Sequence, residues 1–273
     1  MSIESAPVVI CESYLKSRMC SFLYCANLRR VASKVAVLDA QHVNAYLRLR
    51  LTQVSPGSVA NERRMLLTLW SWAWEEGMCD NPLRGVMSIR TPSKPVEAWT
   101  IGECSALVKA TSQFNFSKMR NGTNLGLFLR CWVLVAYETG ARYGDIFAFT
   151  NANVGGGCLS WTTSKTGIPC CRNLSLPCQS AISDMMQGRP VGPIFGGCAS
   201  RRYSFALMRR LLAASGLPGS GKWLRRSGAT HVEQTNPGMA QRFLGHKSAN
   251  MAAQHYLDQR QLQRPGLCPP AIV

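Results

Sequence analysis

The last fifty residues of the chain place cationic side chains and a tyrosine at short spacings. Lys222 and Arg225 are three residues apart and would share one face if they open a helix. His246 follows a glycine, and Tyr256 lies ten residues further on. A phenol has a pKa near ~10 and is a poor nucleophile unaided. Positive groups around a phenol are what a tyrosine needs in order to attack a phosphate.

Further motifs lie upstream in a recognisable order. The run Thr139–Asp145 reads TGARYGD, and Ser164–Gly167 reads SKTG. They precede Lys222–Arg225 (KWLR), Leu244–His246 (LGH) and finally Tyr256. At these residues the chain resembles the tyrosine recombinase (phage integrase) family, whose pattern is an arginine box, a lysine-bearing β-turn, H-x-x-R, L-G-H and a nucleophilic tyrosine.

The chain departs from the family pattern at two positions. Lys222 stands where the family usually has histidine, and Tyr256 lies one residue further from His246 than the commonest spacing. Both departures concern the roles of individual residues more than the resemblance as a whole.

The resemblance implies a role for each matched residue. Arg142 and Arg225 would clamp the phosphate, since a guanidinium donates two parallel hydrogen bonds and stays charged. His246 would donate a further hydrogen bond, and Lys165 would act as general acid to the 5′ oxygen. Tyr256 would form a 3′-phosphotyrosyl bond and release a 5′ hydroxyl.

Two residues have supporting or unresolved roles. Asp145 matches the family's acidic residue and is expected to orient the cations. Histidine in place of Lys222 would accept or shuttle the tyrosine's proton, whereas an ordinary lysine is protonated at neutral pH. Either burial beside Arg225 and Arg226 lowers the pKa of Lys222, or its role is electrostatic. We expect the electrostatic role.

The sequence has no carboxylate cluster spaced to hold metal ions, which many phosphoryl-transfer enzymes use. We therefore expect cationic side chains to neutralise the negative charge that builds on the reacting phosphate, with no metal and no other cofactor. The phosphotyrosyl bond conserves the energy of the cleaved phosphodiester bond, so a second 5′ hydroxyl could reverse the step. The resemblance implies a site-specific recombinase or integrase of a mobile element, an enzyme that cuts and rejoins DNA strands.

Charge supports a nucleic-acid partner. The chain carries 31 basic and 14 acidic residues, a formal charge of +17, of which residues 1–93 contribute +4 and 94–273 contribute +13. This excess predicts a polyanionic partner. No secretory signal is visible, and the longest apolar stretch, Leu125–Tyr137, is interrupted by Arg130. We expect a cytoplasmic, nucleoid-associated protein without membrane contact. By resemblance, its partner is double-stranded DNA with paired inverted-repeat sites, bound as a dimer on one site and a tetramer in the synaptic complex.

The twelve cysteines are scattered and include no C-x-x-C pair. Several, such as Cys104 and Cys131, lie in apolar runs, where a thiol behaves as a small hydrophobe. We expect reduced thiols and no zinc site, with a Cys170–Cys171 redox pair as the disfavoured alternative.

The N-terminal third predicts a compact helical unit. Helical periodicity covers Val8–Ala26, Ala40–Leu51 and Val59–Glu76, with Asp39 as an N-cap and Ser55-Pro-Gly in the last gap. The unit resembles the small DNA-clamping domain of the family. Its three tryptophans are expected in the core; they are Trp70, Trp72 and Trp74.

The remainder predicts helices interrupted by a small antiparallel sheet. Thr100 and Glu103 form a capping box, and a helix over Leu125–Thr139 delivers Arg142. Alternating residues between 151 and 177 predict strands whose turn carries Lys165. Helices are expected to resume at Ala181–Gln187 and at Arg201–Ser215.

The predicted fold is mainly α. It comprises a helical core-DNA-binding domain over 1–91, a Pro-containing linker over 92–96, and an α+β catalytic domain of the DNA breaking-rejoining type over 97–273. Candidate DNA-contacting residues outside the motifs are Arg63, Arg64, Arg201, Arg202, Arg209 and Arg210. The first two could equally form a solvated helix face, whereas the last four suggest a surface that follows the phosphate backbone.

Two other functions remain open. A type IB topoisomerase would share the pocket but relax DNA without exchanging strands, and the N-terminal helical module favours a recombinase over it. A DNA-binding protein that keeps the fold but has lost catalysis is the other alternative, and Lys222 is the residue that keeps it open. A covalent-adduct assay separates it from either enzyme.

Overall fold

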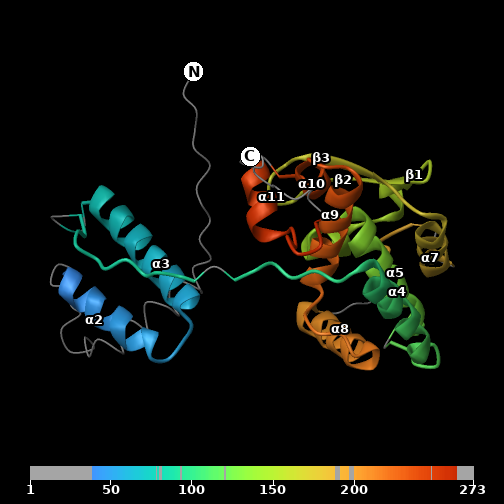
Figure 1. Cartoon of the computed structure of the whole chain (residues 1–273), viewed down its shortest axis with the longest axis horizontal. Coiled ribbons are helices and arrows are strands. Elements are labelled where there is room, and N and C mark those ends of the chain that lie inside the picture. Colours follow the sequence, from blue (N-terminus) through green and yellow to red (C-terminus); the bar gives the residue numbers. More distant parts are fainter. Residues whose placement is uncertain are drawn as a thin grey trace, which may run out of the picture. The chain divides into compact units, whose positions relative to one another are not determined.

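The computed structural model describes residues 39–77, 79, 82–92, 94–119, 121–187, 191–196, 200–246 and 248–262. The helix predicted over Val8–Ala26 lies outside these residues. Contacts divide the chain into two units, Met1–Lys94 and Pro95–Val273, and the division falls inside the predicted linker. Each unit is described by itself below (Figure 1).

The described part of the first unit contains two helices, α2 (Ala40–Leu51) and α3 (Pro56–Glu75). The bounds of α2 are those predicted, and the Asp39 side chain accepts a hydrogen bond from the backbone NH of His42 at 3.0 Å. The prediction that α3 begins at Val59 was wrong. Ser55 caps the helix and Pro56 is its first residue, where a fixed φ and a missing NH are tolerated.

The described part of this unit has a small core and a partly buried ion pair. Val43, Leu47 and Val59 are buried, and the Arg50 guanidinium contacts the Glu62 carboxylate at 2.8 Å. The expectation that the tryptophans lie in the core was wrong for two of them. Trp72 and Trp74 are 47% and 45% exposed, on either side of buried Ala73. Residues adjacent along a helix point about 100° apart, so the two flanking rings cannot share the face of Ala73.

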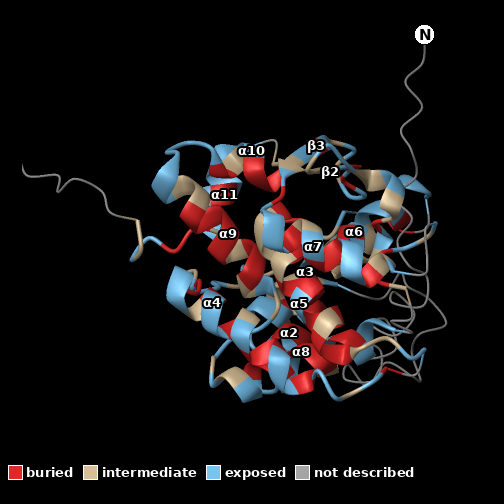
Figure 2. Cartoon of the chain, turned by 90° about the vertical axis from the view of Figure 1, so that its right-hand side faces the viewer, coloured by how far each residue is buried: buried red, intermediate tan, exposed pale blue. Residues whose placement is uncertain are grey.

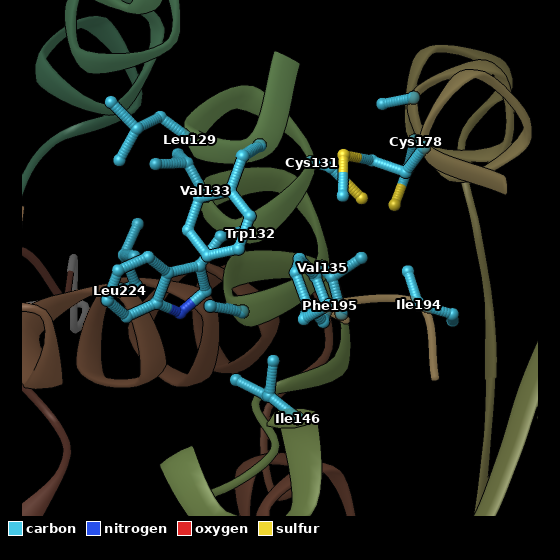
Figure 3. Packing of buried hydrophobic residues seen from close by; sticks show 14 of the residues in the cluster. Leu129, Cys131, Trp132, Val133, Val135, Ile146, Cys178, Ile194, Phe195 and Leu224 are labelled. Atoms are coloured by element: carbon cyan, nitrogen blue, oxygen red, sulfur yellow. The ribbon is translucent and has the colours of Figure 1, made fainter. Parts of the chain in front are cut away.

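The second unit is built around α5 (Leu125–Thr139), whose bounds are those predicted. It contacts α7, α9 and the short 3-10 helix η3 (Thr111–Phe114). Figure 3 shows its apolar side chains with Leu224 of α9 and Cys178 of α7 in one buried cluster. Before it lies α4 (Ile101–Ala110), and the predicted capping box between Thr100 and Glu103 is present.

A three-stranded antiparallel sheet follows, in the order β1 (Val154–Gly155), β2 (Cys158–Thr162), β3 (Pro169–Asn173). Thr162 pairs with Pro169, so Lys165 lies in the turn between β2 and β3, as predicted. Gly167 in that turn has φ 65°, a conformation that glycine adopts without steric cost.

The next helix, α7 (Leu176–Met186), begins five residues before the predicted start at Ala181. Residues 174–176, expected to extend a strand, lie outside the sheet. The Ser175 side chain caps α7 by accepting from the Cys178 NH, and this local hydrogen bond starts the helix.

The remaining elements carry most of the motifs; α6, α8 and α9 contact α5, and α10 packs against α9 and α11. They are α6 (Tyr143–Ala148), η4 (Asn151–Asn153), α8 (Arg201–Ser215), α9 (Lys222–Thr235), α10 (Ala240–Leu244) and α11 (Ala249–His255). The bounds of α8 match the prediction. Figure 2 shows α9 largely buried, as expected for a helix packed on α5. None of the helices in the described part of the chain is long and apolar enough to cross a membrane.

Candidate active site

The turn from α5 into α6 positions Arg142. Gly140 ends α5 in the left-handed conformation, with φ 57°, and Arg142 is the extended N-cap residue of α6. The Thr139 hydroxyl bonds back to the Val135 carbonyl at 2.6 Å and accepts from the Ala141 NH at 3.1 Å. This hydroxyl fixes the path of the chain immediately before the arginine.

Arg225 is the central cation of the site. It lies on α9, is only 9% exposed, and donates to the carbonyl oxygens of Gly140 and of Leu244, the latter at 2.9 Å. Burial lowers the pKa of Arg225 to about 10, so the side chain remains charged at neutral pH. Gly228, one turn later, allows the close approach of α9 to α5, because a Cβ there would overlap the Tyr137 carbonyl oxygen.

His246 is presented by the end of α10. Gly245 caps that helix with φ 60°, and the His246 backbone NH donates to the Gln241 carbonyl at 3.1 Å. Its Nε2 lies 3.1 Å from Nη2 of Arg225, which can only donate, so Nε2 accepts and the ring proton is on Nδ1. Burial and the charges of Arg225, Arg142 and other cations lower the pKa of His246 to about 4. The imidazole is therefore neutral at pH 7.

Tyr256 contacts both of these groups. It directly follows α11, and its ring centroid lies 4.8 Å from that of His246, in an edge-on arrangement. The guanidinium carbon of Arg225 lies 5.0 Å from the centroid of the same ring. The structure therefore brings together the tyrosine, histidine and second arginine named from the motifs.

Asp145 and Lys165 connect α6 to the turn of the sheet. Asp145 is 4% exposed, and its Oδ1 accepts from the Ser164 backbone NH at 2.9 Å. This bond holds the turn that carries Lys165. The Lys165 side chain is exposed, and its charge is among those that lower the pKa of His246. Asp145 therefore ties α6 to the turn of the sheet.

Several buried polar atoms of these residues have no hydrogen-bond partner among the described residues. They are Nη1 of Arg142, Nε of Arg225, Nδ1 of His246 and Oδ2 of Asp145. A buried polar group without a partner is costly, and such groups concentrate where a ligand completes the set. Three of the four atoms are N–H donors, given the proton on Nδ1 of His246. The site therefore offers an incomplete set of donors suited to an anion.

A hollow of about 1020 Å³ lies between the sheet and α10, and His246 is one of the residues that line it. Arg172 of β3 lies in its wall, and the sequence predicts only a strand at this position. Its Nη2 donates to the carbonyls of Arg242 and Phe243 at 2.6 Å each, which ties β3 to the end of α10. No motif surrounds Arg172, so only the contact across some seventy residues identifies it as a support of His246.

The structure does not bring Lys222 into this cluster. Lys222 is the exposed first residue of α9, and within the part of the chain that the structure describes no hydrogen bond or ion pair joins it to Arg225, His246 or Tyr256. The possibility of burial beside Arg225 and Arg226 was therefore wrong, because a first helical residue has no preceding turn to cover it. Lys222 instead lines a second hollow of about 610 Å³.

Three of the four arginines of α8 line the second hollow, and two lie against aromatic rings. The second hollow is lined by Arg201, Arg202 and Arg209 in addition to Lys222, over an apolar floor that includes Phe205 and Met208. Arg201 also lies 5.3 Å from the ring centroid of Tyr143, and Arg210 lies 5.6 Å from that of Phe114. Aromatic contact occupies one face of these two guanidinium groups.

In the first unit, the two candidate arginines differ. Nε of Arg63 donates to the Met87 carbonyl at 2.7 Å, and its Nη2 donates to that of Val86 at 3.3 Å, so this side chain binds its own unit. Arg64 is exposed and contacts Asn61 at 2.5 Å. Within the described residues no group of three or more histidine, cysteine, aspartate or glutamate side chains is arranged to hold a metal ion.

Comparison with solved structures gives full-length matches. A lambda integrase (75–356) dimer bound to a COC′ core site matches with a TM-score of 0.72 and 19% identity, over 96% of this chain and 94% of that one. XerH site-specific recombinase bound to a palindromic difH substrate matches at 0.69 and 17%, over 90% and 75%. The Tn1549 transposon integrase in complex with circular intermediate DNA matches at 0.65 and 12%, over 95% and 92%.

No family model matches the chain, and no curated protein matches it in sequence. The similarity is therefore one of structure at low sequence identity. The chain has the fold of lambda integrase, XerH and the Tn1549 integrase.

Proposed function

We propose that this chain is a site-specific DNA recombinase that cuts and rejoins strands through a covalent 3′-phosphotyrosine formed by Tyr256. The observation that carries the proposal is the pair of unpartnered donors from Arg225 and His246 against the Tyr256 ring, with a third on Arg142, whose charge acts on both residues. A phosphodiester in this position would accept those hydrogen bonds. Electrostatic stabilisation of this kind is usually the largest contribution to such catalysis.

Each residue then has a proposed role. Arg142 and Arg225 hold the non-bridging oxygens, and neutral His246 donates through Nδ1. The phenol of Tyr256 loses its proton to water as its oxygen attacks phosphorus, the bond to the 5′ oxygen breaks, and Lys165 gives that oxygen a proton. A 5′ hydroxyl of another strand reverses the step, because the phenol is a fair leaving group. No nucleotide is consumed in the cycle.

Asp145 and Lys222 act from further away. Asp145 holds the Lys165 turn through Ser164. We assign Lys222 an electrostatic role toward the duplex, with the α8 residues Arg201, Arg202, Arg209 and Arg210. Of the two arginines in the first unit, exposed Arg64 is the better candidate for a phosphate contact, since the Arg63 side chain donates to the backbone carbonyl of Met87.

The partner is proposed to be double-stranded DNA with paired inverted repeats. Lambda integrase is named in its structures as a dimer on a core site and as a tetramer on a Holliday junction. We propose the same assemblies here, with residues 1–91 binding the core site and 97–273 performing catalysis. The protein would then belong to a mobile element and work in the cytoplasm at the nucleoid.

A nicked suicide substrate tests the proposal. Release of a short strand beyond the nick should trap wild-type protein on DNA as a covalent band, and Tyr256→Phe should abolish the band. Tyr203→Phe, on the exposed side of α8, is the matched control and should retain it. An adduct that persists in Tyr256→Phe would refute the assignment, and an adduct without exchange between two duplexes would point to relaxation instead.

A further inference from the structure

One buried carboxylate holds the chain immediately after Tyr256. Asp258 is 1% exposed and lies two residues beyond the tyrosine. Its Oδ2 accepts from the Ala98 backbone NH at 3.1 Å, and its Oδ1 accepts from the Arg260 backbone NH at 3.1 Å. The Arg260 side chain adds two further bonds, from Nε at 2.9 Å and Nη2 at 2.7 Å. A carboxylate with this many donors is strongly fixed in place.

The surrounding contacts join three segments that are distant in sequence. The Asp258 backbone NH donates to the Thr230 hydroxyl of α9 at 3.1 Å. The Gln261 side chain donates to the Ala98 carbonyl at 2.7 Å. Leu257 is 5% exposed and packs in a cluster with Phe243 and Leu244. The backbone after Tyr256 is therefore fastened to α9 and to the start of the catalytic unit.

The chain before Tyr256 is held far less firmly. Helix α11 has seven residues, and only Ala252 among them is buried. A short helix with one buried side chain gains little stability from packing. The position of the phenol relative to Arg225 and His246 must therefore depend mainly on the segment that follows the tyrosine.

We propose that Asp258 is a positioning residue that fixes Tyr256 against Arg225 and His246 for attack on the phosphate. The proposal rests on the function proposed above. Asp258 does not touch the reacting atoms; it acts through the two residues of backbone that separate it from the nucleophile. Displacement of a nucleophile by about 1 Å can cost on the order of 10²-fold in rate, so loss of this anchor should slow cleavage strongly.

The test compares Asp258→Asn with Asp184→Asn, a matched change of an exposed aspartate on α7. Single-turnover adduct formation on the nicked duplex is measured at saturating DNA, and DNA affinity is measured separately. For Asp258→Asn we expect adduct formation slower by roughly 10- to 100-fold with Kd within about threefold of wild type. Asp184→Asn should match wild type in both.

Two further variants separate the anchor from general stability. Arg260→Gln leaves the bonds from the Ala98 and Arg260 backbones in place, so it should slow the adduct only about two- to threefold, as expected for the loss of an arginine that is itself largely exposed. Thr230→Val removes the hydroxyl that accepts from Asp258 while it preserves shape. It should also slow the adduct, and it decides the question if Asp258→Asn unfolds.

Amide hydrogen exchange gives a readout that does not require activity. Asp258→Asn should accelerate exchange over residues 256–262 and leave the α5 amides unchanged. Local acceleration with a wild-type adduct rate would overturn the positioning role, as would a slowed adduct with unchanged exchange in that segment. Absence of an adduct with the wild-type protein would instead overturn the proposed function and this role with it, while exchange still reports whether the anchor exists.

Discussion

At the scale of single residues, the site combines a fixed cation with a neutral donor. Arg225 is charged although buried, and its charge helps to lower the pKa of His246 to about 4. The imidazole can then donate a hydrogen bond to a phosphate, and it need not gain or lose a proton during the reaction. A lysine or protonated histidine in the same position would add a second charge that burial disfavours.

The exposed position of Lys222 determines the role that we propose for it. Because it is exposed and lines the hollow beside Arg202 and Arg209, we expect it to act on DNA binding rather than on the chemical step. Lys222→Gln should raise Kd several-fold, roughly the effect of one lost phosphate contact, and Lys222→Arg should retain wild-type affinity. Cleavage at saturating DNA should change little in either. A decrease of about 10²-fold in the saturated rate of Lys222→Gln, the size expected for a donor at the developing charge, would return Lys222 to the reacting phosphate.

At the scale of elements, the contact between α5 and α9 determines where Arg225 lies. Gly228 permits this contact, since a side chain there would meet the Tyr137 carbonyl and the Phe243 ring, the latter at 3.1 Å. The arginine is one turn away on the same helix, so any shift of α9 moves it relative to Gly140 and Leu244. The packing of two helices therefore controls the geometry of the phosphate clamp.

Substitution of Gly228 tests this coupling. Gly228→Ala should lower the free energy of unfolding by about 1–3 kcal/mol, the usual cost of overpacking, and should reduce adduct formation with it. Gly144→Ala on α6 is the control, because a Cβ there meets nothing within 4 Å. Urea unfolding and the suicide-substrate assay measure the two effects. Equal behaviour of the two variants would contradict the argument.

At the scale of the whole molecule, the charge of +17 should dominate DNA binding. If both units contact phosphates, log Kd should rise with log salt at a slope of several units, roughly 0.9 per neutralised phosphate. The double change Arg202→Gln with Arg209→Gln should lower that slope by about two units, or about one for each lost contact. Fluorescence anisotropy across a salt series measures the slope. A Kd that does not depend on salt would exclude binding through phosphate contacts from both units.

Several helix bounds and the order of the motifs follow from the amino-acid sequence alone, although the starts of α3 and α7 do not. The bounds of α2, α5 and α8, the Thr100–Glu103 capping box and the turn that carries Lys165 were all predicted. These features depend on signals within a few residues, such as caps, apolar periods and glycines that end a helix. The chemistry proposed for Tyr256 rests on the sequence as well, because residue types and motif order indicate it.

Only the tertiary structure decided which side chains meet. Trp72 and Trp74 are exposed, Lys222 is exposed whereas Arg225 is buried, and Arg172 supports the end of α10 from β3. Asp258 binds a backbone NH 160 residues earlier in the chain. Burial and long-range hydrogen bonds depend on how helices and strands pack against one another, and no local pattern of residues encodes that packing.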